Sequence, residues 1–96
     1  MRKISEEAAD ALIFGHAYNK SNTKVIKVVG GTRMYLHGNL IAEKINGILR
    51  ITNSGWFTNV TKDRLNAFPN VSIYQVRGVW FLNGNVWDGS WATITK

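Results

Sequence analysis

The side chains best suited to chemistry in this chain are the basic ones of its middle part, and the chemistry they could do is anion binding. Between Lys20 and Arg50 there are six bases and one acid, Glu43. The bases are Lys20, Lys24, Lys27, Arg33, Lys44 and Arg50. With a net charge of +6 over 96 residues, this distribution favours an anionic partner, either nucleic acid or an acidic protein surface. Lysines placed on a solvated sheet face for solubility are the simpler explanation, and composition does not separate the two.

Patterns for catalysis or metal binding are scarce. His16 and His37 are outside any metal-ligand spacing, and the absence of cysteine excludes a disulfide framework and a thiolate metal site. Three of the six acids fall in the first ten residues, and Glu43 has a basic partner available in Arg50, so few carboxylates remain for acid–base work. The sequence contains no nucleophile elbow, phosphate loop or dinucleotide fingerprint. We therefore predict a protein without enzymatic activity, metal or cofactor.

An amphipathic helix is expected over Ser5–Tyr18. Ser5 is a suitable N-cap, and Glu6 and Glu7 would fall in the first turn, where the helix dipole favours anions. Apolar residues then recur at spacings of three and four: Ala8, Ala9, Leu12 and Ile13. This spacing is typical of a helix that covers one face of a sheet.

Four strands are predicted next, separated by turn dipeptides. They span Lys24–Val29, Thr32–Leu36, Leu40–Ile45 and Ile48–Thr52. Asn46-Gly47 is a strong hairpin signal, because a type I′ turn needs positive φ at both central residues. A two-residue loop there would pair Glu43 with Arg50 across the strands and leave the alternate face more apolar, with Lys44 at its edge.

A short helix is predicted over residues 61–67. With Thr61 as N-cap, Val60 and Leu65 have the spacing of a hydrophobic staple. Phe68-Pro69 ends this helix, because the residue before proline is pushed out of the helical region. Its solvent side is expected to present polar and basic residues, which are Lys62, Asp63, Asn66 and, near the rim, Arg64.

The C-terminal stretch Val71–Ile94 is rich in strand-forming residues and nearly uncharged, so we expect it to supply much of the core. Three turn dipeptides divide it into hairpins, and one of them should belong to a longer loop: Arg77-Gly78, Asn83-Gly84 and Asp88-Gly89. The predicted fold is thus a single α+β domain over residues 1–96. An N-terminal amphipathic helix packs on a twisted antiparallel sheet of six or seven short strands, mostly hairpins, and the short helix at 61–67 lies between strands four and five.

Two kinds of binding remain open. For nucleic acid, bases on the sheet and near the short helix could hold phosphates while Tyr35 or Trp56 stacks on a base. Against this, the aromatic residues concentrate where charge is lowest, and no recognition-helix, RNP or KH pattern is present. For protein, four tryptophans exceed what a small core needs, and tryptophan is a common interface anchor. An exposed Trp56 or Trp91 would favour an interface, or self-association through a strand edge.

Five short runs between Tyr35 and Ile94 form a distinctive pattern in their order. They are LHGNLIA (36–42), GWFT (55–58), RLNA (64–67) preceded by Thr61, VWFLNG (79–84) and WDGSW (87–91). Together these runs resemble small proteins encoded by bacteriophages and prophages. The resemblance implies a viral or mobile-element setting and supplies no catalytic residue. Small phage proteins of this kind often act on host defence systems, nucleases or transcription.

We therefore predict a phage-type accessory protein of the host cytoplasm that acts by binding, without membrane association. The expected partner is an anionic surface of a host protein or protein–nucleic-acid complex, for example a defence complex such as a CRISPR effector, which the protein would inhibit. The alternative is direct, largely sequence-independent binding of DNA or RNA. A homodimer formed through a strand edge or an exposed tryptophan is compatible with either. The predicted binding residues are Trp56, Lys62, Arg64, Asn66, Arg33 and Lys44.

Overall fold

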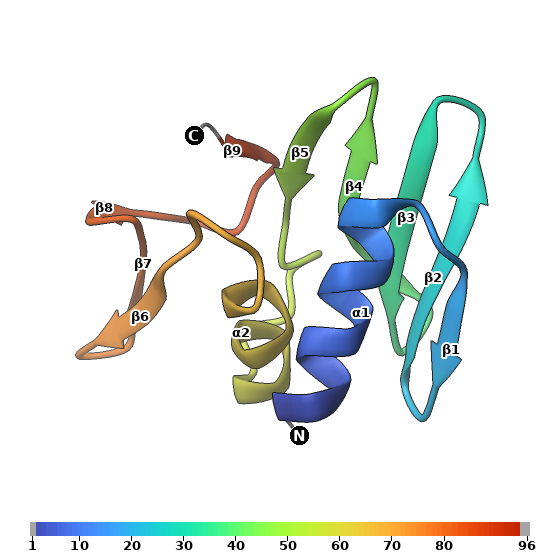
Figure 1. The fold of residues 1–96 in the computed structure, drawn as a ribbon. Helices are drawn as coiled ribbons and strands as arrows, with labels where there is room; N and C mark the ends of the chain where they lie inside the picture. The colour runs from blue at the N-terminus through green and yellow to red at the C-terminus, as the bar shows by residue number, and fades with distance from the viewer. Residues whose placement is uncertain (1, 95–96) are drawn as a thin grey trace.

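Two helices and nine strands make up residues 2–94, the part of the chain that the computed structural model describes (Figure 1). The N-terminal half contains α1 (Arg2–Phe14), β1 (Tyr18–Lys20), β2 (Thr23–Val28), β3 (Gly31–Leu36), β4 (Asn39–Ile45) and β5 (Ile48–Ile51). The C-terminal half contains α2 (Asn59–Asn66), β6 (Ile73–Val76), β7 (Val79–Leu82), β8 (Asn85–Val86) and β9 (Ala92–Ile94). The predicted α+β class is confirmed, with an N-terminal helix, antiparallel strands and a short second helix.

The larger sheet has six antiparallel strands in the order β1-β2-β3-β4-β5-β9. The turn between β4 and β5 is the predicted two-residue loop, with φ of 51° at Asn46 and 81° at Gly47. Positive φ at both positions fits a type I′ turn and fixes the register. Glu43 therefore lies opposite Arg50, as predicted.

The first helix ends four residues earlier than predicted. Gly15 takes a φ of 81°, and its amide and that of His16 both donate to the Ala11 carbonyl, at 3.0 and 2.8 Å. A glycine in the left-handed conformation is a common helix C-terminus. The released residues from Tyr18 onward form β1, an edge strand that the sequence did not predict. Ser5 is not the N-cap: it lies inside α1 and is buried.

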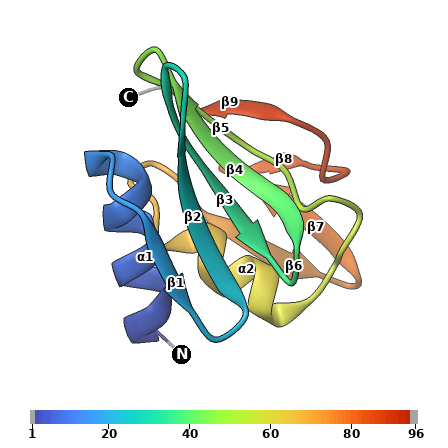
Figure 2. The same ribbon diagram turned by 90° about the vertical axis from the view of Figure 1, so that its right-hand side faces the viewer.

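Both helices lie on the same side of the larger sheet (Figures 1 and 2). The core lies between them and the sheet, where Ala8 and Leu12 of α1 are buried together with Met34, Ala42 and Ile51 of the strands. Alanine at the contact allows the helix to approach the sheet closely. Thr32 completes this contact, because its hydroxyl donates to the Leu12 carbonyl oxygen at 2.7 Å.

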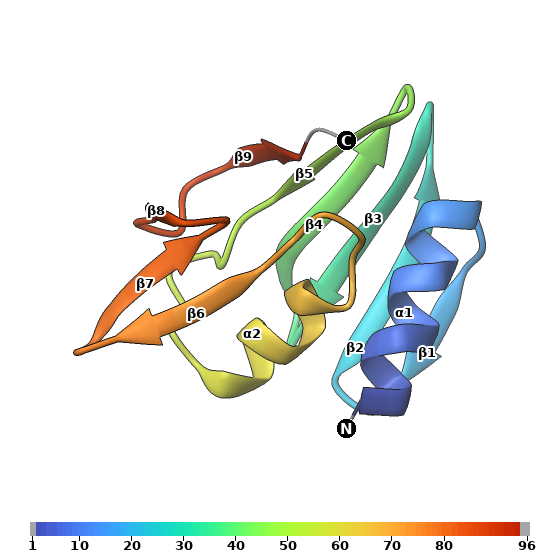
Figure 3. The ribbon, with the colours of Figure 1, turned by 60° about the vertical axis from the view of Figure 1, so that its left-hand side comes forward.

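The C-terminal stretch divides between two sheets instead of forming one set of hairpins. Strands β6, β7 and β8 make a separate three-stranded sheet beyond α2, and β9 returns to pair with β5 (Figure 3). The predicted turn at Arg77-Gly78 is present, while Asp88-Gly89 belongs to the loop before β9. Because β1 is an additional strand, α2 follows the fifth strand and not the fourth.

Candidate binding surface on the open face of the sheet

One face of the six-stranded sheet points away from both helices. The cross-strand register aligns Ile26, Arg33, Glu43, Arg50 and Thr93 in one row over five strands. The preceding residue on β3, Thr32, bonds to α1, and neighbouring residues of a strand point to opposite faces, so this row faces away from the helices. We call this surface the open face; it consists of the row together with Lys24, Tyr35 and Trp91 beside it.

A buried carboxylate at the centre of the open face holds two arginines. Arg50 Nε donates to Glu43 Oε2 at 3.0 Å, and Arg33 Nε lies 3.4 Å from Glu43 Oε1. The Glu43 side chain is only 7% exposed, whereas those of Arg33 and Arg50 are 43% and 45% exposed. The carboxylate is therefore shielded from solvent, and the two guanidinium groups it positions remain accessible. Such groups can donate paired hydrogen bonds to phosphate or carboxylate oxygens.

Aromatic rings lie beside these cations. The Arg50 guanidinium carbon is 5.1 Å from the centre of the Trp91 ring, within the range of a cation–π contact, and Trp91 is partly exposed. On β3, Tyr35 lies on the same side of the row and pairs with Lys24. The return of β9 to β5 is what brings Trp91 here. The folded chain thus places Trp91 against Arg50 although the two are far apart in the sequence, which answers one of the two sequence arguments against nucleic acid, the separation of aromatic residues from charge.

The other acids lie elsewhere. Four belong to the helices: Glu6, Glu7, Asp10 and Asp63. The fifth, Asp88, is in the loop before β9, where hydrogen bonds from Ser90 hold the pKa of its carboxyl below the usual range. Among residues 2–94, Glu43 is therefore the one acid in the row, and the open face has an excess of positive charge.

The open face is hollowed at both ends. A depression of about 460 Å³ lies near the β3–β4 turn, lined by Lys24, Ile26 and Tyr35 among others. A second, of about 600 Å³, lies at the opposite end and includes Arg33 and Arg50 in its lining. Both are shallow and open, as suits an extended ligand better than an enclosed small molecule.

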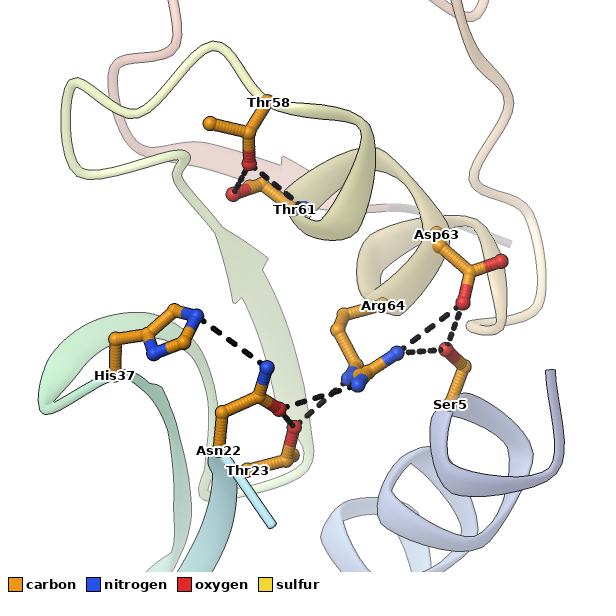
Figure 4. A network of polar contacts seen from close by, with 8 residues as sticks. All are labelled: Ser5, Asn22, Thr23, His37, Thr58, Thr61, Asp63 and Arg64. Atoms are coloured by element: carbon orange, nitrogen blue, oxygen red, sulfur yellow. Dashed lines mark hydrogen bonds and ion pairs between the residues drawn. The ribbon is translucent and has the colours of Figure 1, made fainter. Parts of the chain in front are cut away.

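Arg64 was predicted to be a binding residue near the rim of the short helix, and this is wrong. Only 1% of its side-chain surface is exposed. Figure 4 shows its guanidinium surrounded by partners: Nε donates to Thr23 Oγ1 and Nη1 to Ser5 Oγ, both at 2.8 Å, while Asp63 Oδ2 and Asn22 Oδ1 each lie 3.2 Å away. A side chain so enclosed cannot meet a partner. It joins the two helices to the start of β2.

A separate pair of threonines fixes where α2 begins. Thr58 is the N-cap, because its Oγ1 accepts a hydrogen bond from the Thr61 amide at 3.2 Å (Figure 4). The prediction of Thr61 as N-cap was wrong by three residues: Thr61 is buried in the first turn, and its hydroxyl lies 2.9 Å from that of Thr58. The hydrogen-bond network around Arg64 extends on the sheet side to His37, whose Nε2 is 3.3 Å from Asn22 Nδ2.

Two further predicted residues have structural partners. Lys44 faces the helices, and its Nζ donates to the Ile13 carbonyl oxygen at 3.2 Å, near the C-terminal end of α1 where a cation is favoured. The Asn66 side chain bonds to both backbone groups of Ile73, at 3.0 and 2.7 Å. These contacts connect elements of the fold, so neither residue belongs to the open face.

The remaining predicted residues are accessible but lie in different places. Lys62 Nζ donates to Gln75 Oε1 at 3.1 Å and lies 5.4 Å from the Trp80 ring centre. Trp56 is 54% exposed, before the start of α2, and lines a hollow of about 250 Å³ that is mainly apolar. Arg33 is the one predicted residue on the open face. The structure therefore does not gather the six into one site.

The six predicted binding residues did not include Arg50, Trp91, Lys24 or Tyr35, although the nucleic-acid alternative had considered Lys24, Tyr35 and Arg50. A signal for Arg50 was available, because its pairing with Glu43 was predicted correctly and Glu43 in turn pairs with Arg33. Nothing in the sequence indicated Trp91, because its position depends on β9 crossing back to β5 after three intervening strands.

The whole chain can be compared with known proteins. A family model described as Kyanoviridae Gp96 protein matches residues 1–95. The chain belongs to this family. Membership in the Gp96 family confirms a small phage-encoded protein, as the sequence resemblance indicated. Neither the curated proteins nor the solved structures contain a match. Within residues 2–94 neither helix is long and apolar enough to cross a membrane, and no three potential ligands are grouped to hold a metal ion.

Proposed function

We propose that this phage protein acts by binding, without catalysis, and that its open face binds single-stranded nucleic acid with little sequence preference. The observation that carries the proposal is the arrangement around Glu43. This buried carboxylate holds the half-exposed guanidinium groups of Arg33 and Arg50 on an uncovered sheet face, with the Trp91 ring against one of them. Guanidinium groups bind phosphate oxygens, and rings stack on bases.

A single strand fits this face better than a duplex. Its bases expose their ring faces, whereas those of a duplex are stacked on one another. Tyr35 on β3 and Trp91 just before β9 lie on the same side of the Arg33–Arg50 row, on strands far apart in the sheet, so a strand crossing from β9 to β3 would meet ring, cations and ring in turn. Every base has a ring face, so such contacts tolerate any sequence.

Fluorescence anisotropy with labelled single-stranded DNA and RNA tests the proposal. Binding should weaken with salt, with log affinity falling by about 0.7 per unit of log salt for each phosphate neutralised.

The matched variants Lys24→Ala and Lys27→Ala distinguish the two faces of the sheet. Both residues are exposed on β2, but Lys27 pairs with Thr32, which bonds to α1. Lys24→Ala should reduce affinity several-fold more than Lys27→Ala. Absence of binding to either nucleic acid at about 50 mM salt contradicts the proposal.

Glu43→Gln is a second test variant, for which we expect a gain in affinity for nucleic acid. It removes the negative charge that partly neutralises Arg33 and Arg50, so affinity for nucleic acid should rise even though the ion pairs are lost. The thermal midpoint should fall, because the buried contacts are weakened. If Arg33 and Arg50 served only to stabilise the sheet, the melting temperature would fall with no gain in affinity.

A second candidate function, binding to a host protein, has its own observation. Trp56 and Phe57 are both exposed and adjacent, and Trp56 borders the apolar hollow lined also by Leu36, Ile41 and Val60. An exposed aromatic side chain beside an apolar pocket is typical of an interface anchor. That the partner is a host defence complex, such as a CRISPR effector, stays a prediction.

Capture from host lysate with and without nuclease distinguishes this function from the first. A specific protein should be retained after nuclease treatment, lost with Trp56→Ala and kept with Lys24→Ala. If retention instead requires nucleic acid and Lys24, the first function is supported and the second is contradicted.

A further inference from the structure

The small sheet carries apolar residues on the face that points away from the core. In the register, Tyr74 lies opposite Phe81 and Phe81 opposite Val86, while Val76 lies opposite Val79. We call these five residues the outer face. Four of them are exposed, with Val86 at 70%, and the Tyr74 and Phe81 rings are stacked with centroids 5.3 Å apart.

The outer face breaks the usual alternation of a sheet in contact with water. Antiparallel strands with one solvated face alternate apolar and polar residues. Here Ile73 and Trp80 are buried on the inward face, which also carries the polar Gln75 and Asn85, whereas all five outward positions are apolar. Strands of this composition are typical of a sheet covered on both sides. A contiguous exposed patch of this kind marks an interaction site.

We infer that the outer face binds a second copy of this chain, in a weak two-fold dimer with the two small sheets packed face to face. The charge of the protein supports a second copy as the partner. Each copy carries +6, so repulsion between two copies is weakest where the contact surface has no charge, and all five outer-face residues are uncharged. In a two-fold dimer the same residues meet on both sides, so an apolar face is complementary to itself.

The hairpin geometry agrees with this arrangement. Arg77 is at the tip of the β6–β7 hairpin. If the hairpins of the two copies run antiparallel to each other about a two-fold axis through the outer face, their tips point in opposite directions. Pairing through the edge of β6 is obstructed instead, because the Ile73 backbone groups are already bonded to the Asn66 side chain. The outer face is therefore free for contact with a second copy, whereas the edge of β6 is obstructed.

The contact is small. Five side chains bury less than the ~1,200 Å² in total that a standard specific interface needs, so the dimer should dissociate on dilution. The inference does not depend on nucleic-acid binding. It adds to it, because a dimer carries two open faces and could bind one strand at two places.

Sedimentation velocity of the nucleic-acid-free protein, from low to high micromolar concentration, tests the inference. The weight-average mass should rise toward that of a dimer. Val79→Glu and Val86→Glu should each weaken association about tenfold or more, because each introduces two like charges across the two-fold axis. Val86 is the milder site, at the exposed edge of the sheet, and keeps the test valid if Val79→Glu unfolds. Val29→Glu is the control, since Val29 is fully exposed in the turn between β2 and β3.

Two results overturn the inference. One is a monomer at every concentration. The other is a dimer that Val79→Glu and Val86→Glu leave unchanged while circular dichroism shows both variants folded, because such a dimer uses another surface. Raising the salt concentration should leave the dimer intact or strengthen it, since screening reduces the repulsion between copies. Nucleic-acid binding has the opposite salt dependence. Failure of the dimer therefore does not affect the proposed function of the open face.

Discussion

Arg64 Nη1 on α2 donates a hydrogen bond at 2.8 Å to Ser5 Oγ on α1, across 59 residues of sequence. Ser5 Oγ in turn donates to Asp63 Oδ2, so one hydroxyl connects the buried cation to its neighbouring carboxylate. A third contact, from Arg64 Nε to Thr23 Oγ1, attaches both helices to β2. The network positions α2, and with it the chain that leads to the small sheet.

Arg64→Met should therefore be strongly destabilising. Methionine fills much of the same space but leaves the oxygens of Ser5 and Thr23 without the Arg64 donor, and Asp63 keeps the hydrogen bond from Ser5 but loses its cation. Removing one partner of a buried ion pair typically costs about 3–5 kcal/mol, and we expect a loss toward the lower end because Asp63 is partly exposed. Urea denaturation followed by circular dichroism measures it.

Lys62→Met is the control for this change, since it removes the same charge from the same helix. Lys62 makes one exposed hydrogen bond and a cation–π contact with Trp80, so the expected cost is only about 1 kcal/mol. Arg64→Lys should not restore stability, because an ammonium group cannot reach partners in three directions as the guanidinium does. Equal losses for the Arg64 and Lys62 variants would show that the network is not what stabilises α2.

The N-cap of α2 gives a second prediction. Thr58→Ala removes the oxygen that accepts from the Thr61 amide and should lower the free energy of unfolding by about 1 kcal/mol. Thr58→Ser retains the oxygen and should stay close to wild type. The same urea measurement distinguishes them. A larger loss from Thr58→Ser than from Thr58→Ala would contradict the assignment of Thr58 as N-cap.

Local features of the fold were predictable from the sequence and distant ones were not. Turn dipeptides fixed the β4–β5 hairpin and the pairing of Glu43 with Arg50, because the turn type depends on two adjacent residues. The burial of Arg64 depends on Ser5 and Thr23, which are 59 and 41 residues away, so no local pattern could indicate it. For the candidate site, the charge was visible in the sequence, but the position of Trp91 required the tertiary fold.

Tyr18 should make stability depend on alkaline pH. Burial raises the pKa of Tyr18 to about 12, and the hydrogen bond from its hydroxyl to Glu7 Oε1, at 2.8 Å, adds to the increase. The neutral phenol is thus favoured in the folded state relative to the unfolded chain, where its pKa is about 10. Its contribution to stability is fully present below about pH 10 and is lost as pH rises toward 12.

The comparison of wild type with Tyr18→Phe isolates this contribution. The difference between their free energies of unfolding should shrink between about pH 10 and 12. Tyrosinate absorbance offers a direct reading, in which Glu7→Gln lowers the pKa of Tyr18 by removing the negative charge beside its hydroxyl. Tyr74→Phe, at an exposed ring, is the control. Ionisation of Tyr18 near pH 10 in the folded protein would contradict the prediction.

Gly89 and Gly84 form a matched pair for the loop that returns β9 to β5. Both have left-handed backbones, with φ of 88° and 91°, so alanine at either position should cost about 1–2 kcal/mol in backbone strain. A Cβ atom at Gly89 would lie 2.1 Å from Asn53 Oδ1, whereas one at Gly84 would meet nothing within 4 Å. Asn53 is fully buried, its backbone N–H donates to the Gly89 carbonyl at 3.0 Å, and its side-chain Oδ1 accepts from the Gly55 N–H at 2.8 Å, so it has little room to move.

Gly89→Ala should therefore destabilise the protein by about 1–3 kcal/mol more than Gly84→Ala, in keeping with the cost of overpacking. Combining Gly89→Ala with Asn53→Ala tests the cause. Shortening Asn53 removes the clash, so the double variant should lose less than the sum of the single losses. Strict additivity would mean that the clash is absorbed elsewhere. Because this loop carries Trp91 to Arg50, Gly89→Ala should also weaken nucleic-acid binding, while Gly84→Ala should leave it unchanged.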